Sequence, residues 1–130
     1  MSLDATARRR YARQLLLGEI GEAGQERLSA AVFCRRAESD ADAYAVAAEY
    51  LRRAGCRESE SDGTPMRASS ADAVTHFAGR ASLRAPAAAI LGAFAAVEHL
   101  KEALGAGEPR DFPPDLTLQL KTEQSPFSKA

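Results

Sequence analysis

The feature that most constrains the fold is an alanine-rich segment at residues 86–104. Its larger apolar residues recur at intervals of three or four positions, which is the spacing of one helical face. Pro86 suits the first turn of a helix, and Gly105 suits the left-handed position that closes one. The pattern therefore predicts a helix over 86–104, in which Gly92 and the alanines allow close approach to a neighbouring element. Because alanine makes up 28 of the 130 residues and buries little area, the core is expected to be thin, and close-packed helices or a partner chain would complete it.

A second helix is predicted at residues 40–54, directly after a short apolar run at 31–34. Ser39 or Asp40 is placed to cap its first amides, and Gly55 is placed to close it. A buried strand followed by a helix of this length is the start of a βαβ unit. Weaker patterns predict three more helices, at most one short strand in the polar stretch that follows Gly55, and a strand with one buried face near the C-terminus. The ranges are 6–17, 24–30 and 71–78 for the helices, 57–70 for the polar stretch and 116–121 for the last strand.

These elements predict an α/β protein: a reduced Rossmann-like three-layer fold with a small sheet of about three strands and packed helices. Residues 1–121 are expected to form a single domain and residues 122–130 a frayed tail. Phe94 and Leu100 belong to the apolar face of the 86–104 helix, so we expect them in the core or at a dimer interface. A thin core and a lone small sheet favour a homodimer.

Composition narrows the function classes. The net charge of −1 argues against nucleic acid as a partner, because such domains carry a clear basic excess. The chain has no uninterrupted apolar run of eighteen residues and no apolar signal-peptide core at its start, which predicts no membrane span. Cys34 and Cys56 are interpreted as reduced thiols of a cytoplasmic protein.

Single reactive side chains carry little signal in this chain. His76 and His99 have no ligand spacing between them, so we interpret them as imidazoles of the surface or the core edge. Cys34 lies inside an apolar run and is interpreted as a small core residue. Cys56 follows Gly55 at a helix end, which does not favour a thiolate nucleophile.

Three stretches together resemble one known family. RYARQLLLGEIGEAGQERLSAA, residues 10–31, is similar to the N-terminal signature of the ThiF/MoeB/HesA superfamily, the bacterial relatives of ubiquitin-activating enzymes. AYAVAAEYLRRAGC, residues 43–56, resembles the first Rossmann helix of that family, and GAFAAVEHLKEALGAGEP, residues 92–109, resembles its late helix. The resemblance implies a nucleotide-binding α/β domain that uses ATP and magnesium to adenylate the C-terminal glycine of a ubiquitin-like or sulfur-carrier protein. The chain would then be a single, truncated ThiF-like domain.

The departures from the family concern the nucleotide site. The family has a GxGGxG phosphate loop after its first strand, and its glycines let backbone amides reach the phosphates. Residues 35–40 of this chain read RRAESD, so side chains would crowd that approach and Glu38 and Asp40 would repel a triphosphate. The acidic second-strand motif, the SNLxRQ segment and the CxxC pairs of many members are also missing. The resemblance with these departures predicts a pseudoenzyme with no catalytic residue, no cofactor and no metal.

The predicted function is a non-catalytic one. The resemblance places Arg13, beside Arg10 and Gln14, where the family's arginine can reach across a dimer into a neighbouring ATP site. The chain would act as a dimerising scaffold, or as the partner subunit of a full-length ThiF/MoeB-type enzyme or a ubiquitin-like sulfur carrier. Three alternatives stay open: a surface ion pair as the only role of Arg13, an active adenylyltransferase with an unusual loop, and a degraded product with no retained role.

Overall fold

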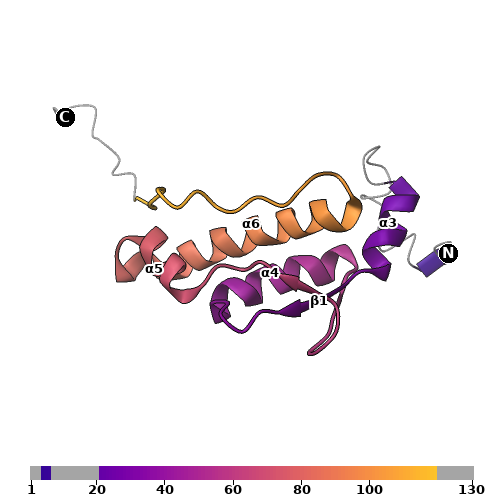
Figure 1. The fold of residues 1–130 in the computed structure, drawn as a ribbon, viewed down its shortest axis with the longest axis horizontal. Helices are drawn as coiled ribbons and strands as arrows, with labels where there is room; N and C mark the ends of the chain where they lie inside the picture. Colours follow the sequence, from indigo (N-terminus) through magenta and orange to yellow (C-terminus); the bar gives the residue numbers. More distant parts are fainter. Residues whose placement is uncertain (1–3, 7–20, 120–130) are drawn as a thin grey trace.

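The computed structural model describes residues 4–6 and 21–119 of the chain, as an α/β arrangement of helices on a small sheet (Figure 1). The elements follow in the order α3 (Gly21–Ala30), β1 (Val32–Arg35), α4 (Ala41–Ala54), β2 (Arg57–Glu58), β3 (Thr64–Met66), α5 (Ala71–Ala78), the 3-10 turn η1 (Ala81–Leu83) and α6 (Arg84–Leu104). The α/β class and a sheet of three strands are as predicted. The predicted helix at 6–17 and the predicted tail at 122–130 fall almost entirely outside the described residues.

The two main helices have the limits that their end residues predict. The Asp40 carboxylate accepts a hydrogen bond from the Ala43 amide at the start of α4, and Gly55 closes that helix with φ of 107°. At the end of α6, Gly105 takes φ of 69° and its amide donates to carbonyls of the last turn. Ser70 caps α5 in the same way as Asp40 caps α4. The sequence-based prediction is therefore confirmed for α4, α5 and α6.

The sheet has the strand order β2-β1-β3, and both outer strands run parallel to β1. The loop between β2 and β3 crosses from one edge of the sheet to the other and passes close to β1. A β-carbon on Gly63 would lie 2.6 Å from the Val32 carbonyl oxygen, and Gly63 has φ of +103°, so only glycine fits this crossing. The polar stretch at 57–70 thus holds two short strands, β2 and β3, where at most one was predicted.

The core lies between the sheet and the helices. Phe33 and Met66 are fully buried, and they pack against small residues of the two long helices. Helices α4 and α6 lie side by side, with Gly92 against α4 near Ala43 and Val46. These described residues build two of the three predicted layers, namely the sheet and the helices that cover its Phe33 face.

The segment after α6 differs from its prediction. Residues 116–119 form no strand; the whole stretch from 105 to 119 runs back along α6 toward α5 without regular structure (Figure 1). Its attachments replace strand pairing. The Leu118 amide donates to the Phe77 carbonyl over 2.6 Å, while Leu116 is 49% exposed. Of the alternating leucines, Leu118 is the one whose side chain packs against α5. Within the described residues no strand edge lies beside this segment, so it forms no strand.

Among the described residues, one helical stretch, Ala81–Leu104, is long and apolar enough to cross a membrane by length and composition alone. Arg84 and Glu98 limit its uninterrupted apolar run to residues 85–97, which is shorter than the run of eighteen that predicts a membrane span. In the fold, 44% of the apolar window is buried against other elements. A core helix that packs on α4, α5 and the sheet has the same composition.

Candidate functional site

The turn between β1 and α4 is the place where the family resemblance predicts a phosphate loop. The carboxylate of Asp40 occupies the N-terminus of α4, where one oxygen accepts from the Ala43 amide over 2.9 Å. The other oxygen is 2.5 Å from the guanidinium of Arg84, which belongs to α6. Burial raises the pKa of Asp40, but the Ala43 hydrogen bond and Arg84 outweigh this effect and hold the pKa below its ordinary value.

The amide of Asp40 is also engaged, because it donates to the Ser69 carbonyl over 2.7 Å. Arg35 does not extend away from the turn; its guanidinium donates to the Ser39 carbonyl and stands over the Tyr44 ring. A phosphate at this helix terminus would have to displace an internal carboxylate that is already neutralised by Arg84. The local geometry is therefore that of a self-capped helix.

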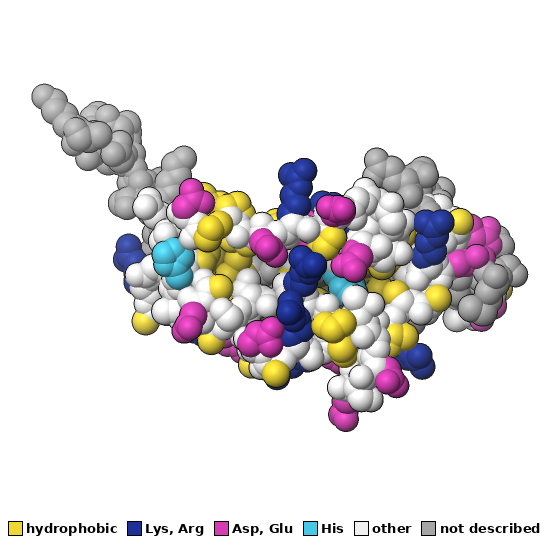
Figure 2. Space-filling model, in the orientation of Figure 1, with side chains coloured by type: hydrophobic (Ala, Val, Ile, Leu, Met, Phe, Trp, Pro, Cys, Tyr) yellow, Lys and Arg dark blue, Asp and Glu magenta, His cyan; other side chains and the backbone are white. Residues whose placement is uncertain are grey.

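A groove lies next to this turn, at the carboxyl ends of β1 and β3. We call it the α5–α6 groove. Its walls are α5, α6, the connection at residues 67–69 and the segment at residues 109–116, and its volume is about 690 Å³. In parallel α/β sheets, ligands bind outside the carboxyl ends of the strands, where neighbouring connections diverge. Figure 2 shows basic and acidic side chains close together across the middle of this face, with hydrophobic side chains toward the end where α5 lies.

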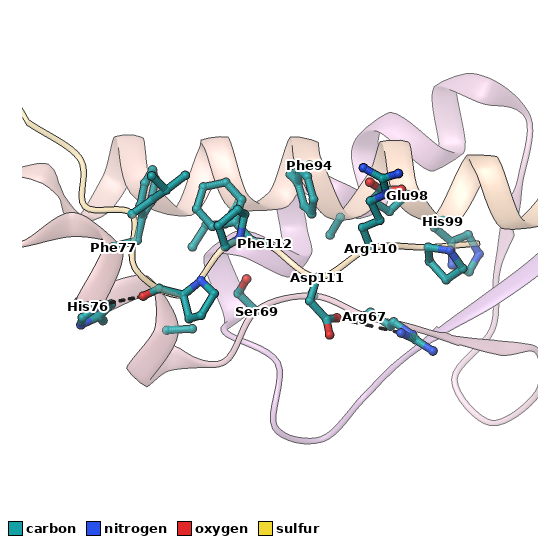
Figure 3. A pocket seen from close by; sticks show the side chains of 18 of the residues that line it. Arg67, Ser69, His76, Phe77, Phe94, Glu98, His99, Arg110, Asp111 and Phe112 are labelled. Carbon is teal, nitrogen blue, oxygen red and sulfur yellow. Dashed lines mark hydrogen bonds and ion pairs between the residues drawn. The ribbon is translucent and has the colours of Figure 1, made fainter. Parts of the chain in front are cut away.

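One end of the groove is aromatic. Phe112 stands edge-on to Phe77, with ring centroids 4.8 Å apart, and edge-on to Phe94, with centroids 5.2 Å apart. Figure 3 shows the three rings in a row along α6. His76 anchors the same segment through a 3.0 Å contact between Nε2 and the Pro114 carbonyl. These contacts hold residues 109–116 across the groove.

The other end of the groove is polar (Figure 3). Glu98 is largely buried and pairs with Lys101 over 2.7 Å; this hydrogen bond and the charge of Lys101 lower the pKa of Glu98. Burial lowers the pKa of His99, which is 7% exposed and stands edge-on to Phe33. Arg67 and Arg110 flank this end from the two sides of the groove.

The residues singled out from the sequence are not brought together in one site. Arg10, Arg13 and Gln14 lie outside the described residues. Phe94 is half-buried in the aromatic end of the groove, and Leu100 is half-buried against the core on α6.

The cysteines and histidines occupy different settings. Cys34 and Cys56 are free thiols; Cys34 is only partly buried, whereas burial raises the pKa of Cys56 to about 11. His76 is exposed and His99 is buried. Within the described part of the chain, no three metal-binding side chains are grouped as a metal site.

Sequence reasoning missed the α5–α6 groove. Its polar end combines residues from the connection after β3, from α6 and from the segment after α6, which are distant in sequence. The stretch PRDFPPD, residues 109–115, reads only as a turn, although the single phenylalanine among its prolines is the feature that marks an anchored segment. Comparisons with protein families, curated proteins and solved structures find no match to this chain.

Proposed function

We propose that this protein acts through protein–protein contact, as a non-catalytic and shortened relative of the ThiF/MoeB superfamily. In this proposal it forms a cytoplasmic homodimer, and it serves as a scaffold or as the partner subunit of a full-length enzyme or a ubiquitin-like sulfur carrier. The observation that carries the proposal is the outward face of α6, which is apolar over most of its length. We call this surface the α6 outer face.

The α6 outer face combines exposed large residues with small ones. Val97 is 57% exposed and Ile90 is 42% exposed. The positions that share this face by helical periodicity are Pro86, Ala89 and Ala93, with Lys101 as the first charged residue at its edge. Tyr50, which is 50% exposed, extends the surface onto α4, because Val46 one turn earlier packs against α6 at Gly92.

A second copy of this chain is the partner that fits this face best. A two-fold dimer places the same surface on both subunits, so an uncharged surface can pair with itself without bringing like charges together. The alanines at 89 and 93 let two copies of α6 approach closely. The helix spans about 31 Å at 1.5 Å per residue, which gives a long contact line.

The self-capped turn supports the non-catalytic part of the proposal. Asp40 supplies the anion that a helix N-terminus would otherwise take from a nucleotide, and Arg84 neutralises it. The alternative, an ATP-dependent adenylyltransferase, would need this turn to open.

The oligomeric state tests the scaffold proposal. We expect light scattering after gel filtration to give the dimer mass for the wild-type chain. Val97→Asp should give a folded monomer, because a carboxylate in the contact would be buried without a partner. Ala45→Asp is the matched control, since Ala45 is exposed on the side of α4 that faces away from α6. A monomeric wild-type chain, or a Val97→Asp dimer, would contradict the proposed contact.

Calorimetry with ATP and magnesium tests the non-catalytic part. We expect no binding tighter than roughly 1 mM, which corresponds to about −4 kcal/mol. Adenylate formation, or tight binding that Asp40→Lys strengthens, would favour the adenylyltransferase instead. Co-purification of a full-length ThiF/MoeB-type enzyme from the native cell would identify the partner subunit.

A further inference from the structure

The polar end of the α5–α6 groove contains a buried side chain whose hydrogen bonds are not made within the described protein. His99 is 7% exposed, and its ring contacts Phe33 by an edge-on arrangement and makes no hydrogen bond to residues 21–119. A neutral imidazole has one donor and one acceptor, and both ring nitrogens of His99 can therefore bond to water or to a molecule in the groove. His99 lines the groove, so a molecule in the groove is the available partner.

Charged side chains of both signs surround His99. Glu98 is paired with Lys101 over 2.7 Å, whereas the two arginines nearby have weaker partners. Arg67 forms a long ion pair of 3.9 Å with Asp111, and the charge of Arg110 acts on Glu98, although within the described residues its guanidinium has no ion pair at 4.0 Å or less. Figure 3 shows these two arginines on either side of the polar end. Glu102 also lines this end, and its negative charge acts on His99. Two guanidinium groups suit a carboxylate, and a carboxylate such as Glu102 suits an ammonium group.

The rest of the groove has an apolar lining that could accommodate one small molecule. Leu91 and Phe94 of α6 and Phe77 of α5 line it, and Phe112 forms part of the roof. A volume of about 690 Å³ lies within the usual range of small-molecule sites. Aromatic rings pack edge-on or offset against such residues, as the three phenylalanines already do with one another.

We infer that the α5–α6 groove binds an aromatic α-amino acid, with its ring against Phe94 and Leu91 and its carboxylate between Arg67 and Arg110. The ammonium group faces Glu102, and His99 hydrogen-bonds the carboxylate. A dianionic phosphate fits less well, because Glu98, Glu102 and Asp111 line the same end. This site is independent of the α6 outer face and of the proposed scaffold function.

Binding of L-phenylalanine to the full chain, measured by calorimetry and by amide chemical shifts, tests the inference. We expect saturable binding of about 1 mM or tighter. The probes 3-phenylpropanoate, 2-phenylethylamine and L-alanine each lack one of the three recognised groups and should bind at least tenfold more weakly. Equal binding of any of these three would overturn the assigned ligand class.

Variants locate the site. Arg67→Gln and His99→Phe should each weaken L-phenylalanine binding at least tenfold, and His99→Phe keeps a ring against Phe33. Arg57→Gln is the matched control, because Arg57 is exposed on β2 and does not line the groove. No saturation below about 10 mM, or wild-type affinity in Arg67→Gln, would overturn the inference. Val97→Asp should bind L-phenylalanine as tightly as the wild type does. Loss of the dimer and loss of the ligand site therefore give different results.

Discussion

At the scale of single residues, Asp40 connects α4 to α6 by binding Arg84, which lies 44 positions later in the chain. Its carboxylate caps α4 and binds Arg84 of α6, so one side chain fixes both the start of α4 and its position against α6. The same carboxylate occupies the N-terminus of α4, which is the place where the family resemblance predicts a bound phosphate.

We predict that Asp40→Ala lowers the free energy of unfolding by about 1–2 kcal/mol, because α4 loses its cap. Asp40→Asn should cost less, since the amide oxygen can still accept from the Ala43 amide. Urea unfolding followed by circular dichroism measures both changes. Asp62→Ala, in the exposed loop before β3, is the control and should leave stability unchanged. Equal stability of Asp40→Ala and the wild type would show that the cap contributes nothing.

His99 gives the protein a dependence on pH. Burial lowers its pKa below the ordinary value of 6.5, and Glu102 offsets only part of that effect. The unfolded chain therefore takes up a proton near pH 6.5 that the folded chain resists. Stability is complete above that pH, and it decreases as the pH falls through 6.5 toward the lowered pKa.

Urea midpoints measured across about pH 5 to 7.5 test this prediction. In the wild type the midpoint should fall below pH 6.5, and His99→Phe should flatten that part of the curve. His76→Asn, which changes an exposed histidine, should retain the wild-type slope. Protonation of Asp40, which removes its charge, takes place in a separate pH range, below about pH 4. A His99→Phe curve that matches the wild type would assign the dependence to another group.

At the scale of elements, the contact between α4 and α6 depends on small residues. Gly92 lies where a β-carbon would be 2.5 Å from the Ala43 carbonyl oxygen and 2.9 Å from Val46 Cβ. Neither neighbour is the flexible end of a long side chain, so a larger residue must push the helices apart. The abundance of alanine that makes the core thin is what permits this close approach.

We predict that Gly92→Ala destabilises the protein by about 1–3 kcal/mol through overpacking, although alanine favours helix formation. Ala45→Val adds bulk to an exposed position of α4 and should change stability by less than about 0.5 kcal/mol. Thermal and urea unfolding of the two variants measure the difference. A Gly92→Ala protein more stable than the wild type would mean that the helices separate without cost.

At the scale of the whole molecule, the α6 outer face and its extension at Tyr50 hold three of the four large hydrophobic side chains that are exposed in the described residues. If a second copy covers this surface, folding and association are coupled, and the melting temperature must rise with protein concentration. We predict this rise for the wild type and its absence for Val97→Asp. Differential scanning calorimetry over a hundredfold range of concentration measures it. A wild-type melting temperature that does not change with concentration would refute a dimer coupled to folding.

Much of the fold could be predicted because its signals are local. The caps at Asp40 and Ser70 and the closing glycines 55 and 105 mark helix ends within a few residues of the chain. The strands β2 and β3 were harder, because two and three residues carry little periodicity. The misassigned strand near Leu118 had the right alternation and no neighbouring strand edge, and only the three-dimensional arrangement reveals that absence.

The sequence by itself determined the helices α4, α5 and α6, the first strand and the α/β class, because capping, periodicity and glycine conformation act between near neighbours. Only the tertiary structure decided which groups meet: Arg84 at the Asp40 carboxylate, Phe112 between Phe77 and Phe94, and His99 at the end of a groove. These contacts depend on how the helices pack on the sheet. Packing is set by the shape of all the side chains at once, and no local pattern in the chain records it.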